Sequence, residues 1–557
     1  MLEANTRVLL DRSVLRVDGH PFFTLAARLY LTPLDAIASA VADLAQAGFT
    51  AVMSPPASPG NLPVLETLFD EAESRGLMVI LAGEARLPDA GHFLAENFRH
   101  RPGLHSYCLP VTEMPPAGSA DEAFARFQHE RDRIRRLDLH HPVWTPFRTD
   151  MAAERWMGTN DFLSIPHPVG GPILPELKPL ELLARLRETA ASSHAPRPLF
   201  CHALECGASN AARLAGIFND DMGVSLAPAR AESWFPYMAR LGSMARRDFF
   251  LPDPDLLLLK ATDLLGAGAR GIVLHFYEYL LGQPPITGRD RFCAMAVLAQ
   301  KIAALDRFFS EGRPPAPELQ FAVDPGHPRV TAQALQHGQD ILIILRRTGP
   351  GEDYWIDSSP LPPLHLRVEI ALPHEDLRAW RADFPSGREL QVSKALRGAI
   401  EILLPEFPLT AMVLLSSSRE RPRETIRALG ERLPAAARYA VEGSRVRLEK
   451  AQVIERELEE YLGMLNTPSG LLEQAWQAQR QAESALEADR PAVAFACAEE
   501  AATALRRLID AQMTTALGVS GSWGDTLLDL LKRSYCTLPR FYRELRKGAM
   551  EASEEYT

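Results

Sequence analysis

Apolar and polar positions alternate along the first half of the chain in blocks that predict strands and helices in turn. Short apolar blocks such as Leu77–Ala82 (LMVILA) are typical of parallel strands buried on both faces. Longer blocks such as Leu34–Ala47 have leucine, isoleucine and valine at helical spacing, and Gly48 favours the end of that helix. Two helix–glycine–strand units follow one another in this way. The pattern is typical of a parallel sheet built by right-handed crossovers.

Continued along the chain, the same pattern predicts eight strands with helices between most of them. The eight are the strand that ends at Arg28, then Phe49–Met53, Leu77–Ala82, Leu104–Pro110, Pro142–Phe147, Asp161–Ile165, Pro198–Cys206 and Gly271–Phe276. An eight-unit closed (β/α)8 barrel (TIM barrel) fits this count and length better than an open doubly wound sheet. No glycine-rich phosphate fingerprint follows the first strand, which also argues against a dinucleotide-binding sheet.

The pattern changes twice after the barrel segment. A proline-rich linker, Gly312–Pro317, precedes short β-prone segments such as DILIILRRT and AIEILLP, which indicate an antiparallel β-sandwich. From about Arg419 onward, alanine, glutamate, arginine, leucine and glutamine recur at helical spacing, which predicts an α-helical bundle. We expect its helices at Arg445–Leu465, with Ser444 as N-cap, and at Gly470–Ala488 and Pro491–Leu517.

These changes divide the chain into a barrel (1–311), a β-sandwich (318–417), a helical bundle (418–520) and a C-terminal docking tail (521–557). The predicted fold class is therefore multidomain α/β. A helical surface as large as that of the bundle could mediate homo-oligomerisation, or it could cover the barrel or the sandwich. The residues alone do not decide between these two roles.

Composition narrows the function classes. At 557 residues the chain is long enough for about three or four domains, and 46% of its residues are hydrophobic, as in globular proteins. A net charge of −11 argues against a nucleic-acid partner. Charged residues interrupt the apolar runs well short of a membrane span, and the start of the chain lacks the apolar core of a signal peptide. We therefore expect a cytoplasmic protein or an excised piece of a secreted one.

Metal and cofactor signatures are missing from the sequence. The six cysteines are scattered with no CxxC pair, which argues against a zinc knuckle and against a disulfide framework. No group of histidine, aspartate and glutamate has metal-ligand spacing, and no GxSxG nucleophile elbow occurs. We expect neither a metal nor a cofactor.

Two glutamates follow predicted barrel strands. Glu205 ends the apolar stretch PLFCHALEC, and Glu113 follows the fourth strand in the stretch VTEMP. An acid at the C-terminal end of a barrel strand often takes part in catalysis. The simpler alternatives are a helix cap or a surface ion pair for Glu205 and a solvated loop acid for Glu113.

Several stretches together resemble the clan A glycoside hydrolases, barrels of the β-galactosidase and cellulase kind. They are LRVDGHPFFTLAAR, AGFTAV, RGLMVILAG, HSYCLPVTEMP, PLFCHALEC and GARGIVLHFYEY, and the resemblance covers roughly residues 14–310. In that clan the acid after strand four is the proton donor and the acid ending strand seven is the nucleophile. The resemblance therefore implies Glu113 as acid/base and Glu205 as nucleophile. It departs at Thr112, where the clan carries asparagine.

The expected activity is retaining hydrolysis of an oligo- or polysaccharide, which needs two carboxylates about 5–5.5 Å apart. The alternative is a carbohydrate-binding or scaffolding protein on a hydrolase-like barrel that cleaves nothing. The further candidates for substrate contact are Arg28, Trp144, Asp150, His167, Trp234, Tyr277 and Glu278.

Several of these candidates have simpler alternatives. Asp150 and His167 could each be a solvated loop residue. Arg28 could steady the nucleophile or form a structural ion pair. Trp144 and Trp234 could stack on sugar rings, and Trp144 could equally fill the barrel. Glu278 is the reserve for Glu205 if the strand order is displaced by one.

Overall fold

The computed structural model describes most of the barrel strands, the antiparallel sheet and the C-terminal helices. The described residues are 7–29, 32–84, 87, 89–109, 120–146, 159–167, 198–205, 253–275, 282–283, 286–316, 319–323, 330–347, 363–369, 377–385, 387–394, 399–405, 407–418, 420–462 and 470–519.

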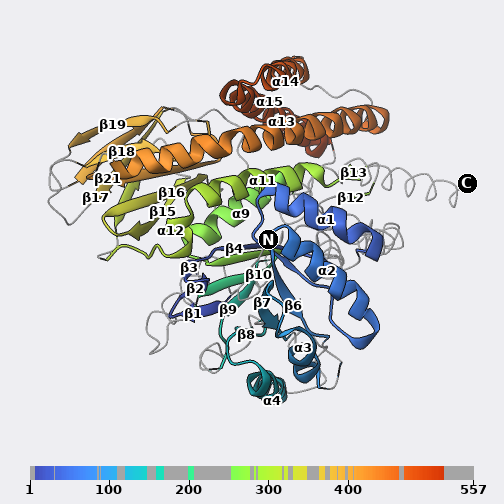
Figure 1. The fold of residues 1–557 in the computed structure, drawn as a ribbon. Helices are drawn as coiled ribbons and strands as arrows, with labels where there is room; N and C mark the ends of the chain where they lie inside the picture. The colour runs from blue at the N-terminus through green and yellow to red at the C-terminus, as the bar shows by residue number, and fades with distance from the viewer. Residues whose placement is uncertain are drawn as a thin grey trace, which may run out of the picture.

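Eight parallel strands form one curled sheet in the order β8-β7-β6-β5-β4-β11-β10-β9 (Figure 1). Strands that are neighbours in the sheet are also consecutive in the order of the chain, apart from β11 and β4. This last strand and this first strand pair with each other. Within the described residues, ladder hydrogen bonds join all neighbours except β8 and β9. The strands are β4 (Thr24–Arg28), β5 (Ala51–Met53), β6 (Met78–Ala82), β7 (Leu104–Cys108), β8 (Val143–Trp144), β9 (Leu163–His167), β10 (Leu199–Glu205) and β11 (Gly271–His275).

Two polar residues bridge the gap between β8 and β9. The Asp161 amide donates to the Val143 carbonyl (3.2 Å), and the Asp161 carboxylate accepts from the Val143 amide (2.7 Å). The Asn160 side chain bonds both the amide and the carbonyl of Thr145, each at 3.0 Å. Side chains thus replace part of the missing ladder, so the sheet curls back on itself at this edge.

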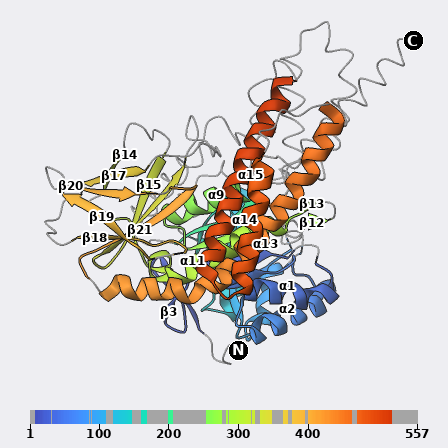
Figure 2. The same ribbon diagram turned by 90° about the horizontal axis from the view of Figure 1, so that it is seen from above.

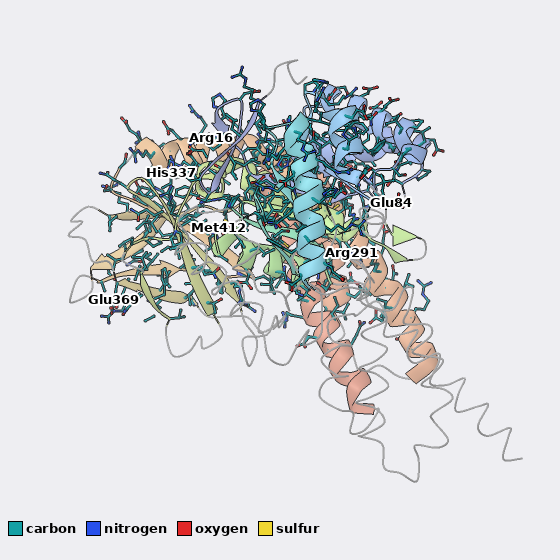
Figure 3. All side chains as sticks on the ribbon, turned by 90° about the horizontal axis from the view of Figure 1, so that it is seen from below. Arg16, Glu84, Arg291, His337, Glu369 and Met412 are labelled. Carbon is teal, nitrogen blue, oxygen red and sulfur yellow. The ribbon has the colours of Figure 1, made fainter. Side chains whose placement is uncertain are left out.

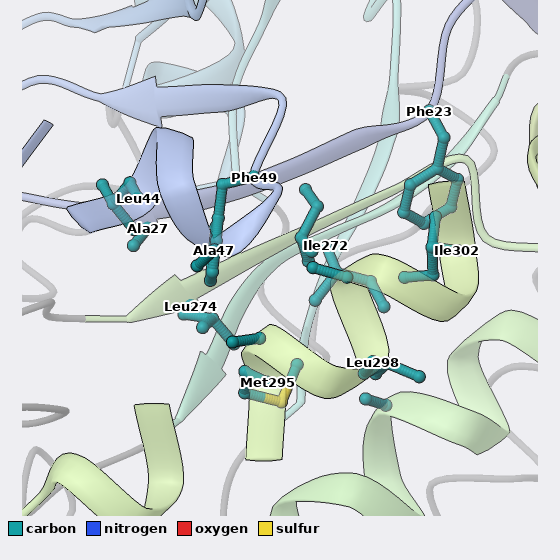
Figure 4. Close-up of a cluster of buried hydrophobic side chains, with 14 of the residues drawn as sticks. Phe23, Ala27, Leu44, Ala47, Phe49, Ile272, Leu274, Met295, Leu298 and Ile302 are labelled. Carbon is teal, nitrogen blue, oxygen red and sulfur yellow. The ribbon is translucent and has the colours of Figure 1, made fainter. Parts of the chain in front are cut away.

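Helices follow most of the strands, as the pattern of apolar blocks predicts. Their bounds are α1 (Leu34–Ala47), α2 (Leu62–Ser74), α3 (Ala90–Phe98), α4 (Ala120–Leu137), α9 (Pro254–Gly266), α11 (Arg289–Ala304) and the short α12 (Asp306–Ser310). The predicted stop at Gly48 is confirmed: Gly48 is left-handed (φ 90°) and caps α1. Figure 4 shows how Leu44, Ile272 and Met295, from α1, β11 and α11, meet in one buried cluster.

Aromatic rings fill the inside of the curled sheet. Phe162 and Phe200 stack at 5.0 Å between ring centroids, and Trp144 lies 5.4 Å from Phe200. The Phe200 ring occupies the space beside Gly271, where a Cβ atom would come within 2.0 Å of it. The interior is therefore a packed core.

A small antiparallel sheet covers the N-terminal end of these strands. It consists of β1 (Val8–Asp11), β2 (Val14–Val17) and β3 (His20–Pro21). Val8 and Leu15 belong to the same buried cluster as the interior residues of the parallel strands. The hairpin thus closes the bottom of the barrel-like sheet.

The second large sheet is antiparallel, as the β-prone segments after the linker predict, and has the order β14-β17-β20-β19-β18-β21-β16-β15. Its two halves are continuous through β19, which pairs with β18 at Glu389–Leu390 and with β20 at Gln391–Lys394. The strands are β14 (Gln320–Val323), β15 (Val330–His337), β16 (Asp340–Arg347), β17 (Leu364–Glu369), β18 (Arg378–Arg381), β19 (Glu389–Lys394), β20 (Ala399–Leu404) and β21 (Thr410–Ser416).

Strand β16 is buried on both faces. Ile341, Ile343 and Leu345 face the core of the antiparallel sheet, whereas Leu342 and Ile344 belong to the large core shared with the barrel helices. The neighbouring strand β21 divides its side chains in the same way. This double burial explains why DILIILRR is continuously apolar instead of alternating.

Three C-terminal helices follow (Figure 2): α13 (Glu420–Leu462), α14 (Leu471–Glu487) and α15 (Pro491–Val519). Helix α13 packs on α11, and α14 and α15 pack on each other and on α13. The last two match their predicted ranges. The prediction for the first is wrong, because α13 begins 25 residues before Arg445 and Ser444 lies inside it. The Ser444 hydroxyl is 2.6 Å from Gln479 of α14, and it is Ser418 that accepts hydrogen bonds from the first amides of α13.

Buried ion pairs fix these helices to the N-terminal ends of α9 and α11. Arg447 of α13 donates two hydrogen bonds to Asp255 (3.0 and 2.9 Å), and Arg506 of α15 donates a third (2.8 Å). Lys450 of α13 lies 2.6 Å from Asp290 at the start of α11. Among the described helices, none combines the length and the apolar character that a membrane-crossing helix needs.

Candidate functional site

The C-terminal ends of the parallel strands bring together two residues that the sequence singles out. Glu205 of β10 pairs with His275 of β11, and the ladder between β11 and β4 reaches Leu274 and Ala27, one residue before His275 and Arg28. Glu205, His275 and Arg28 therefore stand at one level on three adjacent strands. With about 4.8 Å between strands, the backbones of Glu205 and Arg28 are roughly 10 Å apart.

Glu205 is the last residue of the seventh parallel strand in chain order, as predicted. The reserve assignment of Glu278 assumed a strand order displaced by one, and the described strands show no such displacement. Arg28 ends the first strand and is 5% exposed, so its guanidinium belongs to the interior of the rim and not to the outer surface. His167 ends β9, where it pairs with Leu204 in the ladder.

Several predicted site residues lie wholly or partly outside the residues that the structure describes. Only the main chain is described for Glu205 and His167. The other candidates that lie outside the described residues are Glu113, Asp150, Trp234, Tyr277 and Glu278.

Trp144 is fully buried. Its indole nitrogen donates to the Ser106 hydroxyl (3.1 Å), and its ring contacts Phe162 and Phe200 inside the sheet. No face of the ring is open to a sugar. Of the two roles inferred from the sequence, the structure supports barrel filling.

Glu84 is an acid at the same rim that the sequence analysis missed. It follows β6 by two residues, and its amide donates to the Ala57 carbonyl (3.3 Å) beyond the end of β5. The glutamate is half-buried. The signal was available in the stretch LMVILAGE, where an acid comes shortly after a buried strand, as Glu113 does after the next one.

A neutral histidine lies deep inside the curled sheet. His105 of β7 is within 2.9 Å of the Thr24 hydroxyl and 2.8 Å of the Ser106 hydroxyl, and it is 0% exposed. Burial, together with the nearby His141, lowers the pKa of His105 to about 3. The ring is therefore uncharged at neutral pH.

One group of side chains in the described part of the chain has metal-ligand composition: Asp89, His129 and Glu130. Two of the three already have partners. Asp89 forms an ion pair with Arg133, and Glu130 accepts a hydrogen bond from the Gly91 amide (2.8 Å). The adjacent guanidinium opposes a metal cation, so we assign no metal to this group.

No protein-family profile matches the sequence, and no curated protein matches it. Similar solved structures include a glycoside hydrolase family 30 xylanase from Clostridium acetobutylicum (9% identity, 74% of this chain, 99% of that chain, TM-score 0.35). A family 27 β-L-arabinopyranosidase from Geobacillus stearothermophilus has 9% identity over 71% of this chain and 97% of its own (TM-score 0.38).

A third similar structure is a truncated 3-deoxy-D-arabino-heptulosonate 7-phosphate synthase from Thermotoga maritima (11% identity, 54% of this chain, 91% of that chain, TM-score 0.32). These neighbours include glycoside hydrolases, but they do not share one reaction.

Proposed function

We propose that the protein is a retaining glycoside hydrolase on a closed (β/α)8 barrel, with Glu205 as nucleophile and Glu113 as acid/base. The observation that carries the proposal is the position of Glu205 as the last residue of the seventh of the eight described parallel strands in chain order. Glu113 follows the fourth strand, β7, by five residues. This pair of positions is the one that the resemblance to clan A hydrolases implies for catalysis.

The chemistry follows from two carboxyl groups on opposite sides of a glycosidic bond. Glu113, protonated, gives its proton to the leaving oxygen while the Glu205 carboxylate bonds to the anomeric carbon. Glu113, now a carboxylate, then takes a proton from water, whose oxygen displaces Glu205 from the sugar. Both residues return to their starting forms, and the anomeric configuration is retained.

Arg28 suits the role of a positioning residue for the nucleophile. A guanidinium close to a carboxylate favours its ionised form and lowers its pKa, which keeps a nucleophile charged. Glu113 needs the opposite adjustment, because a general acid must hold its proton near neutral pH. Met114 and Pro115 beside Glu113 supply apolar surroundings of the kind that raise a carboxyl pKa.

Substrate contacts in this proposal come from the ends of the strands and the segments that follow them. We keep Asp150, His167, Trp234, Tyr277 and Glu278 as candidates and add Glu84. Trp144 we assign to the core. We also keep the division of the chain into barrel, β-sandwich, helical bundle and docking tail, with an oligo- or polysaccharide as substrate.

The second candidate function is carbohydrate binding without cleavage. Thr112 favours it, because threonine lacks the amide that in many such enzymes holds the sugar 2-hydroxyl. Both functions place a sugar at the same rim, so a binding measurement does not separate them. Turnover and its loss in a defined variant do.

The test compares the wild type with Glu205→Gln on a panel of 4-nitrophenyl glycosides. We expect Glu205→Gln to lose at least about a thousandfold in kcat/KM, because glutamine cannot form the glycosyl-enzyme. Glu431→Gln, at an exposed position of α13 where the side chain is 70% accessible, is the matched control and should equal the wild type.

Azide separates a nucleophile from a structural residue. With Glu205→Ala, azide can enter the space of the carboxylate and give a glycosyl azide of inverted configuration. Hydrolysis by Glu205→Gln at the wild-type rate would refute the assignment of Glu205. Sugar binding with no turnover of any glycoside by the wild type would favour the second function.

A further inference from the structure

A pocket of about 340 Å³ opens at the bottom of the barrel, between the β1–β2 turn and the segment after α12. Its lining residues are Asp11, Arg12, Val14, Arg16, Glu311 and Arg313. This volume lies within the range of small-molecule binding sites. Five of the six residues carry charge, which is a high proportion for a pocket at the end of a packed barrel.

The pocket is at the opposite end of the parallel strands from Glu205. Arg270 immediately precedes β11, so it marks the N-terminal end of the sheet. Its guanidinium donates to the carbonyls of Phe309 (2.8 Å) and Gly312. These bonds hold the segment that contains Glu311 and Arg313 at this end.

The two acids of the pocket already have cationic partners. Arg16 lies between them, 3.0 Å from Asp11 and 3.1 Å from Glu311. His337 is a second neighbour of Glu311, at 3.4 Å. Arg16 and His337 lie on the same side of the molecule in Figure 3. Arg16 thus balances one of the two carboxylates, and with Arg12 and Arg313 the five charged residues of the lining carry a net formal charge of +1.

The other two arginines of the lining have no paired acid among the described residues. Arg12 and Arg313 are exposed, and neither side chain forms an ion pair or hydrogen bond in the part of the chain that the structure describes. The main chain of Arg313 is fixed by two hydrogen bonds with Gln336 (2.9 and 2.6 Å). Burial lowers the pKa of Arg270 to about 10; the nearby Arg313 guanidinium lowers it further, and Glu311 acts in the opposite direction.

Arg12 occupies a backbone position that disfavours it. It begins the two-residue turn between β1 and β2 and has φ 56°, in the left-handed region where glycine, asparagine and aspartate are preferred. An arginine here carries a cost in backbone free energy that glycine would not. In this conformation the Arg12 guanidinium lies at the pocket.

We propose that this pocket binds a small organic oxyanion, a phosphate monoester or carboxylate on a molecule of sugar size, through Arg12 and Arg313. A guanidinium matches the geometry of both oxyanions with two parallel N–H donors. Arg16, held by Asp11 and Glu311, is a third positive group along the wall. Val14, 6% exposed, is the apolar residue of the lining.

The test is isothermal titration calorimetry of the full chain at low ionic strength with four probes: glucose 6-phosphate, glucuronate, inorganic phosphate and glucose. We expect binding of at least one of the two charged sugars and none of glucose. Binding of glucose 6-phosphate alone identifies a phosphate site, and binding of glucuronate alone identifies a carboxylate site. The dissociation constant should rise with added salt, because exposed charges are screened.

Three variants separate the pocket from general charge. Arg12→Gln and Arg313→Gln should each weaken binding by about tenfold or more, as the loss of a charge-assisted hydrogen bond predicts. Arg427→Gln removes the same charge from an exposed position on α13, where the side chain is 76% accessible, and should bind like the wild type. Arg12→Gly keeps the turn and removes the guanidinium, so it tests binding even if Arg12→Gln folds poorly.

Three results would overturn the proposal. The first is the absence of binding heat for both charged sugars with the folded wild type. The second is an equal affinity in the wild type, Arg12→Gly and Arg313→Gln, which would assign any binding to a different part of the chain. The third is binding of glucose as tightly as glucose 6-phosphate, because the oxyanion would then contribute nothing.

Discussion

Replacing Arg447 with glutamine tests how strongly the C-terminal helices are fixed to the barrel. The Arg447 side chain is 9% exposed and gives two charge-assisted hydrogen bonds to Asp255, which is 5% exposed. Removing one partner of a buried pair typically costs about 3–5 kcal/mol. Arg506 still bonds Asp255 in the variant, so we expect a loss near the lower limit, about 3 kcal/mol.

The matched control lies two residues away on the same helix. Arg445 is 3.1 Å from Glu449, but both side chains are about half exposed, at 48% and 53%. Such an exposed i,i+4 pair contributes only about 0.3–0.5 kcal/mol. Arg445→Gln therefore removes the same charge from α13 and should leave the free energy of unfolding almost unchanged.

Urea unfolding followed by far-ultraviolet circular dichroism measures both variants. A difference below about 0.5 kcal/mol between Arg447→Gln and Arg445→Gln would refute the reasoning, because it would mean that burial does not strengthen the pair. A double variant, Arg447→Gln with Asp255→Asn, should be less stable than Arg447→Gln alone, because it takes the carboxylate away from the buried Arg506.

Acid adds a second measurement. Burial opposes ionisation of Asp255, but Arg447 and Arg506 outweigh it and lower the pKa of Asp255 to about 2. A carboxyl group with a depressed pKa contributes stability above its unfolded pKa of about 3.8, and this contribution is lost as the pH falls toward 2. In Arg447→Gln the pKa of Asp255 should rise, so acid should destabilise the variant at a higher pH than the wild type.

Two further predictions concern the barrel. Gly271→Ala should lower the free energy of unfolding, measured in urea, by about 1–3 kcal/mol, because the new Cβ would come within 2.0 Å of the Phe200 ring. The control is Gly430→Ala on helix α13, where a Cβ would meet no atom within 4 Å; it should raise the free energy of unfolding by up to about 1 kcal/mol. Equal effects of the two substitutions would contradict the packing described. The pKa of His105 is about 3 in the folded state, so below pH 6.5 the unfolded chain binds a proton at this residue and the folded chain does not. The free energy of unfolding should therefore fall by up to about 1.4 kcal/mol for each pH unit below 6.5. His105→Asn should flatten this dependence between pH 6.5 and 5, and an unchanged slope would show that His105 is not its source.

The parallel strands could be predicted because burial on both faces leaves a clear trace in the sequence. Leu77–Ala82 has no polar residue, and Gly76 before it has the left-handed conformation that ends a helix (φ 75°). Strand order then follows from the rule that crossovers are right-handed and neighbours in sequence pair in space. The same rule predicts that Glu205 and Arg28, each at the end of its strand, lie at the same edge of the sheet.

Other features depend on partners far along the chain and could not be predicted. The first part of α13 is stabilised by packing, since Leu429 and Leu433 join the core of the barrel helices. Pro434 lies inside this helix, and a proline there normally argues against a helix. Trp144 looks the same in sequence whether it faces a sugar or Phe200, because either role needs an apolar ring at that position.

The double burial of β16 and β21 has a consequence for how the molecule can be divided. The change of composition at the proline-rich linker suggests a domain boundary, but hydrophobic packing continues across it. Separating the antiparallel sheet from the rest would expose Leu342, Ile344 and Met412 to water and leave a matching apolar scar beside α9. Damage to the sheet, by mutation or by heat, would therefore reach the barrel directly. The antiparallel sheet, which the sequence marks as a separate segment, therefore shares one hydrophobic core with the barrel.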